Sequence, residues 1–171
     1  MSKVDEALKF AVAAHDGTYR ISLDIPYIIH PLEVLKQIKI WKIDDEDMEA
    51  ATLLHDVVED CGISEKEIES KFGIVVAKLV DELTYIGGVA GKQAYMDSFP
   101  NKSWQAHTIK IADRLCNVRD FILTDRKYAL KYLLKAEYLI NSFGKRDDVD
   151  RKLERVVHND TSVLLGYLNG N

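Results

Sequence analysis

Apolar residues recur along most of this chain at the spacing of a helix, not that of a strand. In the first segment they occupy positions 4, 7, 8, 11 and 12, and His15 continues the same face, which is the i, i+3, i+4, i+7 pattern of an amphipathic helix. No segment alternates apolar and polar residues convincingly as a half-buried strand does, and no internal repeat stands out. The spacing therefore predicts an all-α fold with helices at about 4–15, 32–40, 45–61, 64–72, 74–83, 92–99, 104–123, 126–143 and 148–167.

Capping and breaking residues mark the ends of these predicted helices. Pro31 suits a first helical position, Asp44 or Asp45 is the expected cap of the central helix, and Gly62 is its expected end. A Ser64 capping box and Ser103 start two later helices in the same way. Segments without helical periodicity that carry glycine or proline are predicted loops, at 16–26, 85–91 and 100–103.

Length and composition set the broad class. The 171 residues, 47% hydrophobic and 30% charged, are expected to form a single domain over 1–171 around one core. No apolar run is long enough to cross a membrane and no signal-peptide pattern is present, which predicts a cytoplasmic protein. With a net charge of −5 and no block of Lys or Arg, neither nucleic acid nor a membrane is an expected partner, whereas a small anionic ligand is. Cys61 and Cys116 have no second cysteine at zinc-finger spacing and are interpreted as reduced core thiols.

Residues 53–60 carry an unusual cluster of charge within an apolar helix, formed by His55, Asp56, Glu59 and Asp60. A buried helix tolerates such groups only when their charge is compensated, and a bound cation would do so. Glu59 and Asp60 follow His55 and Asp56 by one helical turn, so two ligands and two proton-transfer groups can share one wall of a site. The alternative is a helix with a solvated acidic end, which the interleaved apolar residues disfavour.

Other polar residues in apolar surroundings are less decisive by themselves. His15 is expected to be a core histidine with a local hydrogen bond, and His30, at a helix entrance, would alone be a capping or core residue. Asp113 shares a face with apolar residues of the 104–123 helix, and Asn117 follows it by one turn. For Asp113, a site role and a surface pair with a neighbouring cation are equally plausible.

Five blocks taken in order carry a specific resemblance. His30, His55-Asp56 and Asp113 are similar to the H…HD…D metal set of the HD-domain phosphohydrolases. More narrowly, the chain resembles the hydrolase domain of RelA/SpoT-type proteins and its stand-alone form, the small alarmone hydrolases, from about residue 4 to 143. The matching blocks are AAHDGTYR, PYIIHP, AATLLHDVVED, FGIVVAKLVDELT and IKIADRLCNVRD.

This resemblance implies an all-α fold that binds one divalent ion, Mn²⁺ in this family, through His30, His55, Asp56 and Asp113. Two imidazoles and two carboxylates suit several divalent metals, so ligand type alone does not select Mn²⁺. The implied reaction is removal of pyrophosphate from the ribose 3′ position of (p)ppGpp, a small nucleotide substrate. The chain has no room for the other domains of the long family members, so it is expected to be a hydrolase only.

The resemblance also implies roles for residues beyond the metal ligands. Glu59 and Asp60 match the acidic pair that positions and activates the attacking water. Asn117 matches a residue near the nucleotide ribose, Arg20 falls at a loop position used around the nucleotide, and Tyr132 aligns with a ligand-contacting tyrosine. Further candidate partners for phosphates, with solvated surface charge as the alternative, are Lys110, Arg114 and Arg119.

The departures from the family pattern fall on the substrate side. Ile21 replaces the family's lysine after Arg20, and Thr18 replaces its glutamine. Loss of the lysine removes a positive charge that would face a guanine nucleotide. Base specificity therefore stays open, and two alternatives remain: another HD-type phosphatase or phosphodiesterase, or a nucleotide sensor that no longer cleaves.

Overall fold

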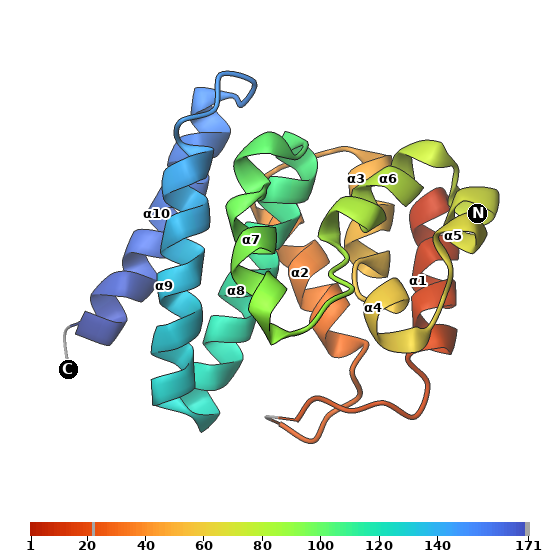
Figure 1. Cartoon of the computed structure of the whole chain (residues 1–171), viewed down its shortest axis with the longest axis horizontal. Coiled ribbons are helices and arrows are strands. Elements are labelled where there is room, and N and C mark those ends of the chain that lie inside the picture. Colours follow the sequence, from red (N-terminus) through yellow and green to blue (C-terminus); the bar gives the residue numbers. More distant parts are fainter. Residues whose placement is uncertain (22, 170–171) are drawn as a thin grey trace.

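The computed structural model describes residues 1–21 and 23–169 and has an all-α fold (Figure 1). The one β pairing among these residues is an isolated bridge between Tyr19 and Pro26. The fold class predicted from the apolar spacing is therefore confirmed. In chain order the elements are α1 (Lys3–Ala14), α2 (Ile29–Ile40), α3 (Glu46–Leu54), α4 (Val57–Cys61), α5 (Glu65–Phe72), α6 (Ile74–Leu83), the 3₁₀ turn η1 (Val89–Gly91), α7 (Lys92–Asp97), η2 (Phe99–Asn101), α8 (Trp104–Thr124), α9 (Arg126–Phe143) and α10 (Arg151–Asn169).

Two helices organise the others. α3 packs against α1, α2, α6 and α8, and the 21-residue α8 also packs against α2, α6 and α9. α9 and α10 stand side by side at the end of the molecule opposite α1 and α5 (Figure 1). Residues from α2, α3 and α8 are thereby brought together in the middle of the fold, although they lie far apart in the sequence.

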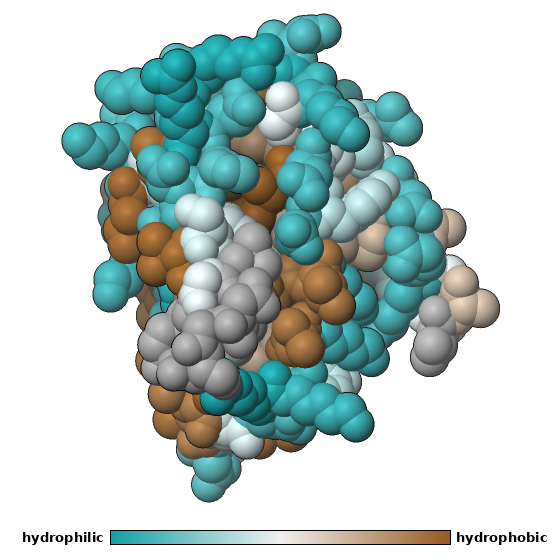
Figure 2. Space-filling model, turned by 90° about the vertical axis from the view of Figure 1, so that its left-hand side faces the viewer, coloured by the Kyte–Doolittle hydropathy of each residue, from teal (hydrophilic) through white to brown (hydrophobic). Residues whose placement is uncertain are grey.

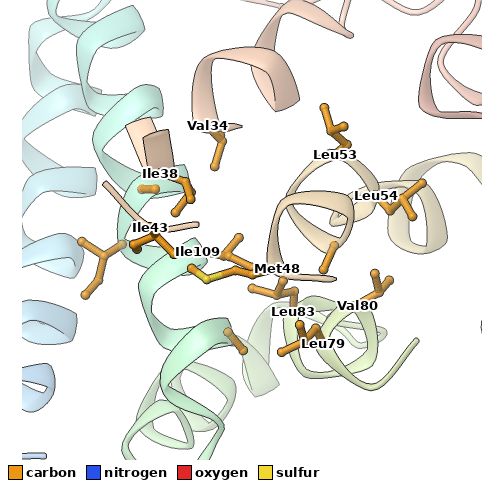
Figure 3. Close-up of a cluster of buried hydrophobic side chains, with 14 of the residues drawn as sticks. Val34, Ile38, Ile43, Met48, Leu53, Leu54, Leu79, Val80, Leu83 and Ile109 are labelled. Atoms are coloured by element: carbon orange, nitrogen blue, oxygen red, sulfur yellow. The ribbon is translucent and has the colours of Figure 1, made fainter. Parts of the chain in front are cut away.

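The apolar core is built around α3, in which every residue from Met48 to Leu54 is buried. Side chains from three neighbouring helices surround it, among them Val34 of α2, Leu83 of α6 and Ile109 of α8 (Figure 3). Complete burial of a side chain of this size contributes about 1.5–3 kcal/mol. The ends of α3 are consequently fixed in position, including the end that leads into His55 and Asp56.

The central helix is interrupted, so the prediction of one helix through residue 61 is wrong. α3 ends at Leu54, α4 begins at Val57, and His55 and Asp56 occupy the turn between them. The Nδ1 atom of His55 lies 2.7 Å from the carbonyl oxygen of Thr52. In an uninterrupted helix this carbonyl would accept from the amide of Asp56, so the imidazole competes with the backbone for the acceptor. Side-chain competition of this kind lies outside what apolar periodicity can predict.

Other predicted boundaries differ by a few residues. α2 begins at Ile29, so His30 and Pro31 both lie within its first turn. Proline is tolerated there because first-turn amides have no helical partner. α10 begins at Arg151 instead of 148. Gly62 ends α4 with φ of 69°, as predicted, because glycine adopts this left-handed conformation without a steric penalty.

The outer side of α9 and α10 is largely hydrophilic, with apolar patches between the polar side chains (Figure 2). Leu130 and Leu134 of α9 contribute exposed apolar atoms on these helices. Scattered apolar side chains are usual on the surface of a folded protein. Among the described residues, no helix combines the length and the apolar character needed to span a membrane.

His107 of α8 is fully buried among aromatic rings. Its Nε2 atom donates to the carbonyl oxygen of Leu139, 2.9 Å away, and its ring lies 5.8 Å from that of Phe99 and 5.2 Å from that of Phe143. Burial lowers the pKa of His107 from 6.5 to about 4, because the charged imidazolium would lose its hydration.

We expect this buried imidazole to make the protein sensitive to acid. The unfolded chain takes up a proton on His107 below pH 6.5, whereas the folded chain does so only near pH 4, so stability is lost as the pH falls through this window. Between pH 7 and pH 5 the loss should be about 2 kcal/mol. Urea unfolding of wild type and His107→Gln at both pH values measures it. The loss between pH 7 and pH 5 should be smaller in the variant by about this amount, and an equal loss in both would refute the assignment.

Candidate metal centre

Two histidines and an aspartate bring potential ligand atoms together where α2 meets the turn between α3 and α4. One ligand atom each from His30, His55 and Asp56 lies within 4.8 Å of the other two. The Nε2 atom of His55 is 3.0 Å from Oδ2 of Asp56, and Nε2 of His30 is 3.8 Å from the same oxygen. Both imidazoles are buried. Residues from two separate segments of the chain therefore form one compact donor set.

The tautomer of His55 leaves a nitrogen available to bind a metal. Because the Thr52 carbonyl only accepts, Nδ1 of the neutral His55 imidazole carries the proton and Nε2 carries the lone pair. This Nε2 atom is buried without a hydrogen-bond partner among the described residues, as is Nδ1 of His30. A lone pair 3.0 Å from a carboxylate oxygen is repelled unless a proton or a metal ion lies between them. The donor set fits a divalent cation that accepts imidazole and carboxylate ligands.

Asp113 of α8 lies directly beside this group but outside it. Its Oδ1 atom is 3.2 Å from Nε2 of His30. Its carboxylate also accepts from Nζ of Lys110 at 2.9 Å and from Nδ2 of Asn117 at 2.5 Å. Of the four ligands expected from the resemblance, three converge, and the fourth is held at the edge of the group by its own hydrogen bonds.

Local charges keep both carboxylates ionised. Burial alone would raise the pKa of Asp56, but the imidazoles of His55 and His30 lower it far below its usual range. Burial opposes ionisation of Asp113 as well, and the Lys110 ammonium together with His30 holds its pKa well below normal. The pKa of His55 is raised, because the Asp56 carboxylate outweighs the cost of burial. Two anionic groups in a buried site attract a cation strongly.

Glu59 and Asp60 stand at the rim of this group on the short helix α4. Both residues are exposed. The Oε2 atom of Glu59 accepts from the backbone amide of Tyr85 at 3.2 Å. Partial desolvation and the nearby Asp56 carboxylate raise the pKa of Asp60. A raised pKa makes a carboxylate a better proton acceptor near neutral pH. The pair is thus accessible from solvent and adjacent to the buried donor set.

A polar stripe runs along the buried side of α8 through the candidate metal centre. Lys110, Asp113, Asn117 and Asp120 follow one another at helical spacing, and all but the half-buried Asn117 are buried. Arg20, from the loop after α1, donates to Asn117 at 3.0 Å and forms a buried ion pair with Asp120. Sequence reasoning missed Asp120, although its position seven residues after Asp113 is a signal that it shares the same face.

Comparisons with known proteins identify the family. A model described as an HD domain matches residues 7–135, which is most of the chain. This protein belongs to the HD-domain family. The His55-Asp56 pair, in the turn between α3 and α4, is called the HD doublet below.

Curated relatives of this HD domain include long and short proteins. The guanosine-3′,5′-bis(diphosphate) 3′-pyrophosphohydrolase of Vibrio cholerae is 36% identical over 115 residues, which cover 62% of this chain and 16% of that protein. A protein of the same name, MESH1 of Xenopus tropicalis, is 37% identical over 120 residues, or 67% of each chain. The HD domain thus spans only about a sixth of the length of the bacterial relative.

A solved structure matches the HD domain over nearly its whole length. It is described as a metazoan orthologue of SpoT that hydrolyses ppGpp, with a TM-score of 0.81, 26% identity and 96% coverage of each chain. The resemblance to the RelA/SpoT hydrolase type that the sequence blocks indicate is therefore confirmed.

Tyr27 is a further neighbour of the HD doublet that sequence reasoning missed. Its hydroxyl donates to Oδ2 of Asp56 at 2.7 Å, and burial raises its pKa far above the usual range, so it stays a donor. Its ring stacks on His15 at 4.7 Å. His15 is buried, as predicted, and its Nδ1 atom lies 3.2 Å from Sγ of Cys61. The signal available was the place of Tyr27 within the PYIIHP block.

The other expected substrate-side residues fall into two groups. Tyr132 of α9 packs against Phe121 with ring centroids 5.1 Å apart, and the Arg114 guanidinium lies 4.9 Å from the centre of the Tyr132 ring. Arg114 directly follows Asp113, and its charge contributes to the lowered pKa of the Asp113 carboxyl. Arg119 instead donates to Gln37 of α2 at 2.6 Å. Because its guanidinium is engaged by α2, a role for Arg119 in binding phosphates stays a prediction.

Proposed function

We propose that this protein is a metal-dependent nucleotide pyrophosphohydrolase that removes pyrophosphate from the 3′ position of ppGpp or pppGpp, leaving GDP or GTP. The observation that carries the proposal is the convergence of His30, His55 and Asp56 with an unpartnered Nε2 atom on the HD histidine. The substrate class comes from relatives named guanosine-3′,5′-bis(diphosphate) 3′-pyrophosphohydrolase. A possible metal site and the HD fold are what such an activity requires.

The metal ligands in this proposal are His30, His55, Asp56 and Asp113, and the ion is Mn²⁺. Bound there, a divalent cation supplies Lewis acidity and an activated water near neutral pH. Tyr27 and Thr52 orient Asp56 and His55 through their hydrogen bonds. Asp113 would complete the ligand set from α8, where its Oδ1 atom lies 3.2 Å from Nε2 of His30.

Glu59 and Asp60 are the catalytic residues in this proposal. They orient the attacking water and take its proton as the water oxygen bonds to phosphorus. The bond between that phosphorus and the ribose 3′ oxygen breaks, and the proton passes to the departing oxygen. The raised pKa of Asp60 suits it to both transfers. The products are one nucleoside phosphate and one pyrophosphate for each water consumed.

Arg20, Asn117 and Tyr132 are the proposed substrate-binding residues. Asn117 adjoins Asp113, and Arg20 adjoins Asn117, so both lie next to the reacting centre. Tyr132 with Arg114 offers an aromatic face and a cation for the remaining phosphates. Ile21 is fully exposed where the family has lysine, and it supplies no charge to the nucleotide.

We further propose that 1–171 forms a single HD-type domain, because one apolar core reaches from α1 to α10.

We expect purified protein loaded with Mn²⁺ to convert ppGpp into GDP and pyrophosphate. Separation of nucleotides by ion-exchange chromatography, with parallel assays for pyrophosphate and orthophosphate, distinguishes the proposed cleavage from phosphatase action. A panel of other nucleotides in the same assay tests the base. Turnover of another nucleotide, with no product from ppGpp, would instead identify a different HD-type hydrolase, and nucleotide binding without any turnover would indicate a sensor.

A further inference from the structure

A continuous chain of hydrogen bonds leads away from Asp113 along the polar stripe of α8. Nδ2 of Asn117 donates to Oδ1 of Asp113 at 2.5 Å, and Oδ1 of Asn117 accepts from Nη2 of Arg20 at 3.0 Å. Nε of Arg20 then donates to Oδ2 of Asp120 at 3.1 Å, and Nη2 reaches the same oxygen. The chain thus links a candidate metal ligand to Asp120, seven residues further along the helix.

The middle of this chain fixes the direction of the Asn117 amide. A guanidinium can only donate, so the amide must present its oxygen to Arg20 and its nitrogen to Asp113. Nδ2 of Asn117 also donates to the backbone carbonyl of Asp113 at 3.0 Å, and Arg20 holds the oxygen end of the amide, so the side chain stays in contact with Oδ1 of Asp113. That oxygen is the one 3.2 Å from Nε2 of His30, and is therefore the one nearest the candidate metal centre.

Asp120, at the end of this chain of hydrogen bonds, holds Arg20 in place. Arg20 is 8% exposed and Asp120 is 7% exposed, so each charge depends on the other for compensation. The loss of one partner from a buried ion pair leaves the other charge uncompensated, which is strongly unfavourable. Without Asp120, the Arg20 guanidinium would move toward solvent or another carboxylate, and its hydrogen bond to Asn117 would be lost. No role in substrate or metal binding follows for Asp120 itself, because Arg20 and Asn117 stand between it and Asp113.

From this geometry we infer that Asp120 is a positioning residue: acting through Arg20 and Asn117, it orients the Asp113 carboxylate and so sets the affinity of the site for a divalent metal. The inference rests on the metal centre in the proposed function. It goes beyond that proposal by assigning metal affinity to an ion pair that spans 100 residues of sequence.

Asp120→Asn should weaken Mn²⁺ binding roughly tenfold, since loss of residues that orient metal ligands typically costs 10- to 100-fold in affinity. Titration of the metal-free protein with Mn²⁺, followed by the electron paramagnetic resonance of the free ion, gives the dissociation constant without any substrate. Asn117→Ala should weaken binding at least as much, because it removes the direct bond to Asp113.

The double variant Asn117→Ala/Asp120→Asn separates a positioning role from a structural one. If Asp120 acts through Asn117, its substitution adds less than about twofold in the Asn117→Ala background. Multiplied effects would refute the inference, and so would an Asp120→Asn affinity equal to wild type.

Asp160→Asn is the matched control, because Asp160 also accepts two hydrogen bonds, from Gln37 and Trp41, but outside the site. It should lower the melting temperature and leave the Mn²⁺ affinity unchanged; an equal loss of affinity there would point to general destabilisation and refute the inference.

A second variant covers the case in which Asp120→Asn does not fold. Arg20→Met/Asp120→Leu removes both buried charges together, and such replacements often keep or increase stability. The folded double variant should still bind Mn²⁺ roughly tenfold more weakly, and wild-type affinity would overturn the inference. Absence of ppGpp hydrolysis by the wild type would count against the proposed function alone, because the metal titrations do not depend on the substrate.

Discussion

Asp56→Ala should abolish stoichiometric metal binding and reduce ppGpp hydrolysis by about 10³-fold or more. Oδ2 of Asp56 lies close to both imidazoles, so its removal takes away the anionic ligand around which the two histidines converge. Metal catalysis is worth several kcal/mol of barrier, and each ~1.4 kcal/mol is tenfold in rate. Metal content of the purified variant and steady-state release of pyrophosphate measure the two effects.

Asp44→Ala is the control for this variant. Asp44 is an exposed carboxylate just before the α3 cap, at the opposite end of α3 from the HD turn. It should keep full metal content and full activity. Retention of one metal per chain in a folded Asp56→Ala protein would show that the ion binds elsewhere.

Asp113→Ala should also lose metal, and unchanged metal content there would remove Asp113 from the ligand set.

Glu59→Gln should keep its metal and lose turnover by about 10²- to 10⁴-fold, the usual contribution of a general acid or base. Glutamine retains an oxygen that can accept from the Tyr85 amide, as Glu59 does, so the position of the side chain is preserved while its basicity is lost. A fall in kcat with an unchanged dissociation constant for Mn²⁺ is the expected signature.

Glu65→Gln provides the same chemical change on a neighbouring helix. Glu65 is exposed in the first turn of α5, and its substitution should leave both kcat and metal affinity at the wild-type level. A Glu59→Gln rate close to wild type would exclude Glu59 from proton transfer and leave Asp60 as the remaining candidate. A parallel loss of metal in Glu59→Gln would instead make Glu59 a ligand.

Most of the helical fold could be predicted from the sequence because burial imposes a 3.6-residue period on it. α5, α6, α8 and α9 begin and end within a residue or two of their predicted limits. The prediction failed where a side chain competes with the backbone: His55 binds the carbonyl of Thr52, and the helix stops. Propensity and periodicity describe backbone preferences, and contain no term for such a competition.

The candidate site divides in the same way. The resemblance of sequence blocks named His30, His55, Asp56 and Asp113, and three of these converge. The Arg20–Asp120 pair could not be predicted, because it joins a loop to a helix 100 residues away, and a contact at that separation leaves no local pattern. The hydrogen bond of Tyr27 could not be predicted for a related reason, since it depends on which carboxylate packs against its hydroxyl in the folded chain.

The interruption between α3 and α4 has a consequence for protein engineering. Transfer of the His55-Asp56 doublet onto an uninterrupted helix of a designed bundle would reproduce the two residue types but not the turn that they occupy. The graft would have to carry the carbonyl that binds Nδ1 of His55, together with the residues up to Gly62, whose left-handed conformation ends α4. The smallest portable unit of this doublet is accordingly a helix, a turn and a second short helix, and an inserted two-residue motif would not suffice.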